Sequence, residues 1–112
     1  MTNIIDSSVI SELKEMGGQE FLSELIEMFL QQSETIMDEI KTHSSSKDAL
    51  SLSKSAHKLK GSCLNLGAQE MSNLCQNIEY QGKENNLEGI DEKISKLVNV
   101  YNETATELKK LL

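Results

Sequence analysis

Apolar residues recur every three or four positions along nearly the whole chain, and no proline interrupts this pattern. Such spacing places the apolar side chains on one face of an α-helix, whereas a half-buried β-strand would alternate every second residue. Proline is the residue that most strongly breaks a helix interior, so its absence permits long helices. Because no segment shows strand-like alternation, we predict an all-α protein.

Short polar or glycine-containing breaks divide the pattern into five helical segments. Asp6 suits the N-cap of the first segment and Ser46 the cap of the third, while Gly67 suits the left-handed position that follows a helix. The breaks are Gly17–Gly18, His43–Ser46, Gly67 and Gly82–Asn86. The predicted helices cover residues 7–16, 19–42, 47–66, 68–81 and 88–111.

Four long amphipathic helices joined by short breaks pack most simply as an antiparallel up-and-down four-helix bundle, with the short N-terminal helix covering one end. At 112 residues the chain is long enough for a single domain, residues 1–112, with one modest core. No apolar run approaches the roughly 18 residues of a membrane span, and the acidic first 30 residues lack the apolar region of a signal peptide. We therefore expect a cytoplasmic protein with no membrane partner.

The two cysteines, Cys63 and Cys75, both fall at apolar helical positions. Free cysteine at such positions behaves as a small hydrophobic residue. The chain contains neither a C-x-x-C pair nor the spacing of metal ligands. We predict two buried free thiols, with a disulfide or redox role as the alternative.

The segment from residue 47 to 66 has two distinct faces when it is drawn as a helix at about 100° per residue. His57, Lys60 and Gly61 lie on one face, because positions three and four apart are neighbours on a helix. The adjoining apolar stripe consists of Ala49, Leu52, Ala56, Leu59 and Cys63. We expect the helix to bury this stripe and to present His57 beside it to solvent.

The chain is acidic overall, with a formal net charge of −7, but the segment around His57 is basic. Its lysines are Lys47, Lys54, Lys58 and Lys60, against the single acid Asp48. Lysines can simply solvate a helix, but a basic strip beside an exposed histidine also suits an anion that is delivered there. Nucleic acid is not expected as a partner, because a phosphate backbone needs a broad basic surface.

These residue types support phosphoryl chemistry on the imidazole. Neutral imidazole is a nitrogen nucleophile, so attack of His57 on an acyl phosphate gives phosphohistidine without a base that first removes a proton. Lys60, one turn later, can reach the phosphate oxygens and offset charge in the transition state. Gly61 removes a side chain that would crowd an approaching partner. His43 is instead expected to be a solvent-exposed residue at a helix C-terminus.

Residues 56–67 have the sequence A-H-x-L-K-G-S-x-x-x-L-G and are followed at 74–79 by L-C-x-x-I-E. Together with the length of the chain, these motifs resemble the histidine-containing phosphotransfer (HPt) domain of multistep two-component relays. The resemblance implies that His57 is the phosphoacceptor, Lys60 the phosphate-orienting lysine and Gly61 the residue that gives the partner clearance. Glu79 falls where the family often has a glutamine or glutamate that hydrogen-bonds the imidazole, and it departs from the glutamine version.

The resemblance also implies a set of partners. An HPt domain accepts a phosphoryl group from an aspartate of one receiver domain and passes it to another, and the receiver supplies the Mg²⁺ and most of the catalytic groups. We therefore expect response-regulator receiver domains, a hybrid sensor histidine kinase, or both as partners. The chain itself is expected to be a monomer that has no cofactor, binds no metal and has no independent catalytic activity.

Other interpretations have different requirements. A metal-carboxylate bundle would need Glu-x-x-His pairs, but Lys54 and Ile40 stand three residues before His57 and His43. A histidine kinase would need an ATP-binding domain, for which 112 residues leave no room. The main alternative is a helical adaptor that binds signalling proteins without phosphorylation. Met1 favours a free-standing protein over a domain excised from a hybrid kinase.

A docking surface is predicted around the histidine. Its apolar members are expected to be Leu50 and Leu64, with Val9 and Leu13 from the N-terminal helix, because none of the four has an obvious place in the core. The surrounding cations are Lys54, Lys58 and Lys60. Such a patch would suit a modest, transient interface.

Overall fold

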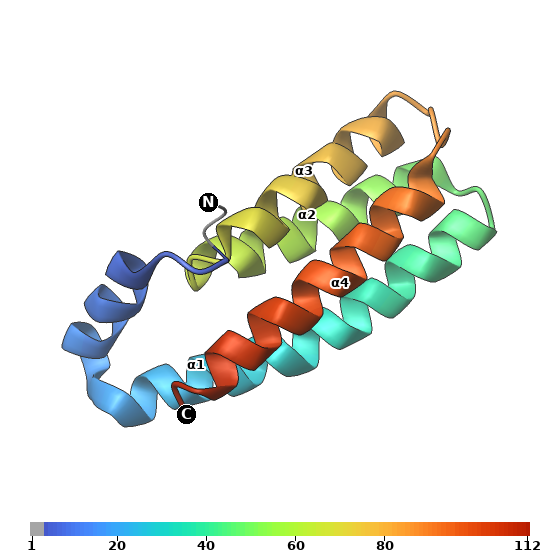
Figure 1. Cartoon of the computed structure of the whole chain (residues 1–112). Helices are drawn as coiled ribbons and strands as arrows, with labels where there is room; N and C mark the ends of the chain where they lie inside the picture. The colour runs from blue at the N-terminus through green and yellow to red at the C-terminus, as the bar shows by residue number, and fades with distance from the viewer. Residues whose placement is uncertain (1–3) are drawn as a thin grey trace.

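The computed structural model describes residues 4–112, and four α-helices with no strand make up that part of the chain (Figure 1). The first three residues of the predicted domain lie outside it. The helices are α1 (Ser7–Ser45), α2 (Ala49–Asn65), α3 (Gln69–Lys83) and α4 (Ile90–Lys109). Consecutive helices run in opposite directions along the bundle in Figure 1, so the predicted all-α up-and-down architecture is confirmed.

Helix α1 consists of two helical parts that meet at Gly18, where φ is 82° and ψ is −176°. Only glycine adopts such a backbone conformation without strain, so the predicted break lies at the glycine pair. The N-terminal part crosses one end of the bundle, where the Asp6 N–H donates to the Gly67 carbonyl over 2.8 Å (Figure 1). Asp6 is also the N-cap, as predicted, and its Oδ1 accepts from the Ser8 N–H at 2.9 Å. The short helix that covers one end of the bundle is therefore confirmed.

The boundary between α1 and α2 differs from the prediction. Ser46 does not cap α2; it ends α1, and its N–H donates to the Thr42 carbonyl over 3.0 Å. Asp48 is the N-cap of α2, and its Oδ1 accepts from the Ser51 N–H at 3.1 Å. Aspartate and serine are equally good N-caps, so local preference alone cannot choose between them. The end of α2 was predicted to within one residue: Leu66 is the C-cap, and Gly67, which follows it, adopts a φ of 72°.

The core runs along the bundle and takes residues from all four helices. Every member of the predicted apolar stripe on α2 is buried. Both cysteines are buried free thiols, as predicted, and the neighbouring Cys75 thiol together with burial raises the pKa of Cys63. The largest fully buried side chains are Leu22, Ile26, Ile40, Leu52, Leu59, Leu66, Met71, Ile78, Leu97 and Leu108. In residues 4–112 no helix is both long and apolar enough to cross a membrane.

Gly82 was predicted to begin a break, but α3 continues through it to Lys83. The residue is buried at a close approach of α2 and α3. A Cβ atom at this position would lie 2.7 Å from the Ala49 carbonyl oxygen and 2.8 Å from the Ser53 Cβ. Backbone atoms cannot move aside as a flexible side chain can, so glycine here allows the two helices to pack closely.

Gly82→Ala is therefore expected to destabilise the fold, although alanine favours a helix more than glycine does. Overpacking a tight contact costs about 1–3 kcal/mol of unfolding free energy. Urea denaturation measures this change. Gly61→Ala is the matched control, because a Cβ at position 61 meets no atom within 4 Å. The unfolding free energy of the Gly61→Ala protein should rise by up to about 1 kcal/mol. A Gly82→Ala protein as stable as the Gly61→Ala protein would contradict the packing argument.

Candidate functional site

His57 lies in the middle of α2 and points away from the core, with 67% of its side chain exposed. Its neighbours Ala56 and Leu59, which belong to the apolar stripe of the same helix, are fully buried. The predicted position of the histidine beside the apolar stripe is therefore confirmed.

Glu79 of α3 contacts this histidine. Its side chain is only 6% exposed, and its Oε2 lies 2.9 Å from Nδ1 of His57. Two lysines share the same carboxylate: Lys60 Nζ is 2.7 Å from Oε1, and Lys83 Nζ is 3.2 Å from Oε2. We call these four residues, His57, Lys60, Glu79 and Lys83, the Glu79 cluster.

The packing of α2 against α3 holds this cluster together. Ser53 lies one turn before His57 on α2, and its hydroxyl donates to the Glu79 backbone carbonyl over 3.1 Å. One turn further along α3, Gly82 allows the helix backbones to approach closely. Glu79 is therefore fixed by its own backbone as well as by the groups on its carboxylate.

The carboxyl group of Glu79 is ionised. Its burial by itself would raise the pKa, but the hydrogen bonds from Lys60, Lys83 and His57 outweigh burial and lower the pKa to about 2. An ionised carboxylate has acceptor sites only. Nδ1 of His57 must therefore be the donor in the 2.9 Å contact.

The protonated Nδ1 determines which nitrogen of a neutral His57 ring has a free lone pair. In a neutral imidazole one nitrogen carries the proton and the other a lone pair, so the hydrogen bond to Glu79 leaves the lone pair on Nε2. The side chain is exposed, with Nδ1 turned toward Glu79. The arrangement thus provides a nitrogen nucleophile whose tautomer and ring orientation are set by a second helix.

Lys60 lies one turn after His57, as predicted, but its ammonium group binds Glu79. Its side chain is 23% exposed, so it is less accessible than the histidine. Lys58 points to the other side of α2 and binds Glu39 of α1, with Nζ 3.3 Å from Oε1. The basic strip expected from the sequence is therefore partly neutralised by acids on the neighbouring helices.

Gly61 is exposed, and a Cβ atom built on it would meet no atom within 4 Å. Its φ is not in the left-handed region, so its backbone does not require glycine either. The fold of the described residues therefore gives no reason for glycine at this position.

Lys83 was not among the site residues predicted from the sequence. It stands four residues after Glu79, a spacing at which an acid and a lysine meet on a helix surface. Acid–lysine pairs at this spacing are common on solvent-exposed helix surfaces, so the spacing alone does not indicate a functional site. It places Lys83 in the cluster because Glu79 faces α2.

The predicted apolar patch is only partly exposed. Leu50 and Leu64 are 63% and 59% exposed on either side of His57 along α2, as expected. Val9 and Leu13 are instead partly buried, and Leu13 packs against the core. Their predicted exposure is wrong, because the N-terminal part of α1 lies against the end of the bundle.

The prediction for His43 is also partly wrong. It lies in the last turn of α1, but it is half-buried where α1 turns into α2. Its carbonyl oxygen accepts from the Asp48 N–H at 2.9 Å. Across residues 4–112 no three His, Cys, Asp or Glu side chains lie close enough together to hold a metal ion.

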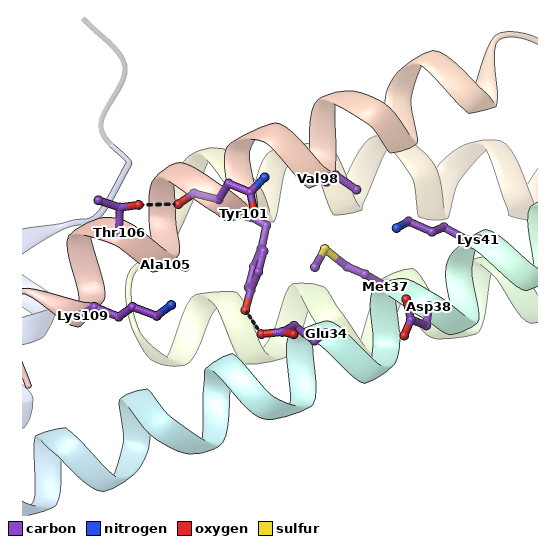
Figure 2. Close-up of a pocket in the computed structure, with 10 residues that line it drawn as sticks. Glu34, Met37, Asp38, Lys41, Val98, Tyr101, Ala105, Thr106 and Lys109 are labelled. Carbon is purple, nitrogen blue, oxygen red and sulfur yellow. Dashed lines mark hydrogen bonds between the residues drawn. The ribbon is translucent and has the colours of Figure 1, made fainter.

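A groove of about 420 Å³ lies between α1 and α4, and Figure 2 shows the side chains that line it. Tyr101 crosses this groove, and its hydroxyl lies 2.9 Å from Glu34 Oε2 (Figure 2). The same hydroxyl lies 3.2 Å from the Leu30 carbonyl oxygen. Burial and the Glu34 carboxylate raise the pKa of Tyr101. No residue of the Glu79 cluster lines the groove, so it is separate from the histidine site.

Comparisons with known proteins point to one family. The family model described as "Hpt domain" matches residues 24–112. The phosphorelay intermediate protein YPD1 of Candida albicans is 35% identical over 89 residues, which cover 78% of this chain and 48% of that protein. The multistep phosphorelay regulator 1 of Schizosaccharomyces pombe is 31% identical over 90 residues, covering 78% of this chain and 30% of that protein.

Two further matches extend this result. The sensor protein TorS of Escherichia coli is 34% identical over 77 residues, which are 69% of this chain and 8% of that protein. The crystal structure of the histidine-containing phosphotransfer protein HptB from Pseudomonas aeruginosa superposes with a TM-score of 0.92 at 22% identity, covering 98% of this chain and 95% of that one. This chain thus spans about half the length of the Candida relative and less of the other two. The match over most of the sequence shows that the chain belongs to the Hpt domain family of histidine-containing phosphotransfer domains.

Proposed function

We propose that this protein is a phosphorelay intermediate in which His57 accepts a phosphoryl group from a receiver-domain aspartate and donates it to another. The observation that carries the proposal is the exposed His57 imidazole, whose Nδ1 is bound to the ionised carboxylate of Glu79. Family membership supports the same role, and the Candida and Schizosaccharomyces relatives are named as a phosphorelay intermediate and a phosphorelay regulator.

The chemistry requires little from the chain beyond positioning. The Nε2 lone pair attacks phosphorus, the bond from phosphorus to the aspartyl oxygen breaks, and the aspartate leaves as a carboxylate. Phosphoryl transfer depends mainly on alignment and on neutralising charge on the transferring oxygens. Lys60 lies one turn from His57 and supplies one such charge by moving from Glu79 to the phosphate. The receiver supplies the Mg²⁺ and the remaining groups.

On this proposal the protein is a carrier with no cofactor and no independent catalytic activity. It works as a monomer with response-regulator receiver domains, a hybrid sensor histidine kinase, or both. We place it in the cytoplasm, where free thiols such as Cys63 and Cys75 persist. Phosphoryl transfer requires only a brief encounter with each partner, which suits a small interface.

The docking surface is proposed to be the face of α2 that carries His57. Leu50 and Leu64 are its exposed apolar residues, and Gly61 leaves the approach to the imidazole open. Lys54 and Lys58 lie on the same helix and are also exposed. Since exposed charges act mainly on the rate of association, high salt should slow binding without abolishing it.

Leu64→Ala is expected to weaken receiver binding several-fold while changing the unfolding free energy by no more than about 0.5 kcal/mol. The residue is 59% exposed, so truncating its side chain leaves no cavity. Leu59→Ala, on the fully buried stripe of the same helix, should instead cost about 2–5 kcal/mol. Denaturation midpoints and receiver affinities of both variants test this prediction. Equal destabilisation by the two substitutions would assign Leu64 to the core and not to the interface.

Incubation with a phosphorylated receiver domain tests the function itself. Phosphate should appear on this chain in a form that is labile in acid and stable in alkali, as phosphoramidates are. It should then move to a second, unphosphorylated receiver. A chain that binds receivers but never carries phosphate would be the phosphorylation-independent adaptor instead.

A further inference from the structure

The carboxylate of Glu79 lies inside the protein and contacts three positive or proton-donating groups. His57 Nδ1 and Lys83 Nζ both lie on Oε2, at 2.9 and 3.2 Å, while Lys60 lies on Oε1. A neutral amide at this position could also accept a hydrogen bond from Nδ1–H and so hold the ring in place. The negative charge of Glu79 is therefore not needed to hold the imidazole in place, and it can serve a second purpose.

We propose that Glu79 keeps the proton on Nδ1 of His57 after the phosphoryl group has bound to Nε2, so that the phosphohistidine remains cationic and donates quickly. This inference rests on the proposed function, because it concerns the phosphorylated form of His57. Glu79 would act as a positioning residue, because it contacts Nδ1 of the imidazole and not Nε2, the nitrogen that carries the phosphoryl group in this proposal.

The proton balance of the transfer explains why this matters. When Nε2 of the Nδ1–H tautomer forms a bond to phosphorus, the ring gains a positive charge and keeps its proton. When a receiver carboxylate attacks phosphorus, the Nε2–phosphorus bond breaks and its electron pair returns to Nε2, so that a neutral imidazole leaves. If Nδ1 lost its proton between these steps, an imidazolate anion would have to leave, which is much less favourable. A held proton lets both transfers proceed without proton exchange.

The charged groups around the ring set the size of the effect. Glu79 is the carboxylate on Nδ1 and favours the cationic ring. Before phosphorylation, Lys60 of α2 and Lys83 of α3 also bind Glu79, and their charges oppose a second cation beside them. Once Lys60 has moved to the phosphate, Lys83 is the lysine that still opposes the cationic ring through Glu79. From α1, Glu39 binds Lys58 at 3.3 Å and Ser55 at 3.2 Å, both residues of α2. Among the ion pairs of the described residues, none brings a group of α4 to His57 or Glu79.

Two substitutions should shift this protonation in opposite directions. Glu79→Gln keeps the shape and the acceptor of the side chain but removes its charge, so the phosphorylated ring should lose its proton at a pH lower by about 1 unit or more. Lys83→Met removes a cation whose side chain is 66% exposed. Glu79 keeps His57 and Lys60 as partners, so the protein should still fold, and the proton should be lost at a higher pH. Lys110→Met is the matched control, because Lys110 is an exposed lysine bound to Glu107 on α4.

The whole protein is phosphorylated with phosphoramidate, a small donor that needs no receiver. The ¹⁵N shift of Nδ1 and the ³¹P shift are then followed as the pH is raised. Above the protonation midpoint of the wild type, Glu79→Gln should also donate to a receiver roughly tenfold more slowly, since a one-unit shift changes the protonated fraction tenfold. At lower pH, where both rings are protonated, the two rates should approach each other.

The outcomes separate this inference from the function on which it rests. Identical titrations for wild type and Glu79→Gln would overturn the role of the Glu79 charge, while phosphate on His57 would keep the proposed function. If Glu79→Gln fails to fold, the Lys83→Met protein provides the test. A protonation midpoint of its phosphorylated ring that is equal to or lower than that of the wild type would overturn the inference. Phosphate that appears equally on a His57→Gln protein would refute both.

Discussion

His57→Gln should abolish phosphoryl acceptance from a receiver domain, because an amide nitrogen has no available lone pair for attack on phosphorus. The fold should be preserved: the side chain is 67% exposed, and exposed substitutions usually change the unfolding free energy by no more than about 0.5 kcal/mol. Glutamine can still donate to Glu79, so the buried carboxylate keeps a polar neighbour. Phosphate incorporation and thermal unfolding, measured on the same preparation, test both halves of the prediction.

His43→Gln is the control for this experiment. His43 is the only other histidine of the chain, and it lies half-buried in the last turn of α1 with no place in the Glu79 cluster. The His43→Gln protein should accept phosphate at the wild-type rate. Residual phosphate on His57→Gln, or its loss in His43→Gln, would show that the phosphoacceptor has been misassigned.

The sequence alone predicts the helices well where a single local rule decides. Gly18 and Gly67 end helical segments because both take a positive φ that side chains disfavour. The start of α2 was harder to predict, because Ser46 and Asp48 are both good N-cap residues. In the structure Asp48 is the N-cap, and its side chain accepts a hydrogen bond from the Ser51 N–H. Gly82 was mistaken for a break because its role depends on a contact with Ala49, far away in the sequence.

The site shows the same limit. His57, Lys60 and Gly61 share one helix, so their spacing in the sequence is enough to place them together. Glu79 could be assigned only through the family resemblance, because its contact joins two helices. Lys83 has no sequence signal beyond an ordinary acid–lysine spacing, and it matters here because Glu79 is buried. The periodicity of the sequence thus places residues on a helix face, but it does not show which residues of two different helices meet.

Gly61→Gln should separate access by a partner from the chemistry of the histidine. Glycine is less favourable than glutamine in a helix interior by roughly 0.5–1 kcal/mol, and the space beside Gly61 is open, so the variant should be slightly more stable than the wild type. The new side chain would project from α2 one turn after His57, where a receiver must approach. Transfer from a receiver should therefore fall at least tenfold.

A small donor makes this prediction decisive, because phosphoramidate does not need the clearance that a protein partner needs. The Gly61→Gln protein should be phosphorylated by phosphoramidate at nearly the wild-type rate while its transfer from a receiver is slow. Asn102→Gln, an exposed substitution on α4, should leave both rates unchanged. If both rates fell together in Gly61→Gln, the glycine would serve the reaction at His57 itself. If neither fell, the receiver would approach from another direction, and the open surface beside Gly61 would have no part in docking.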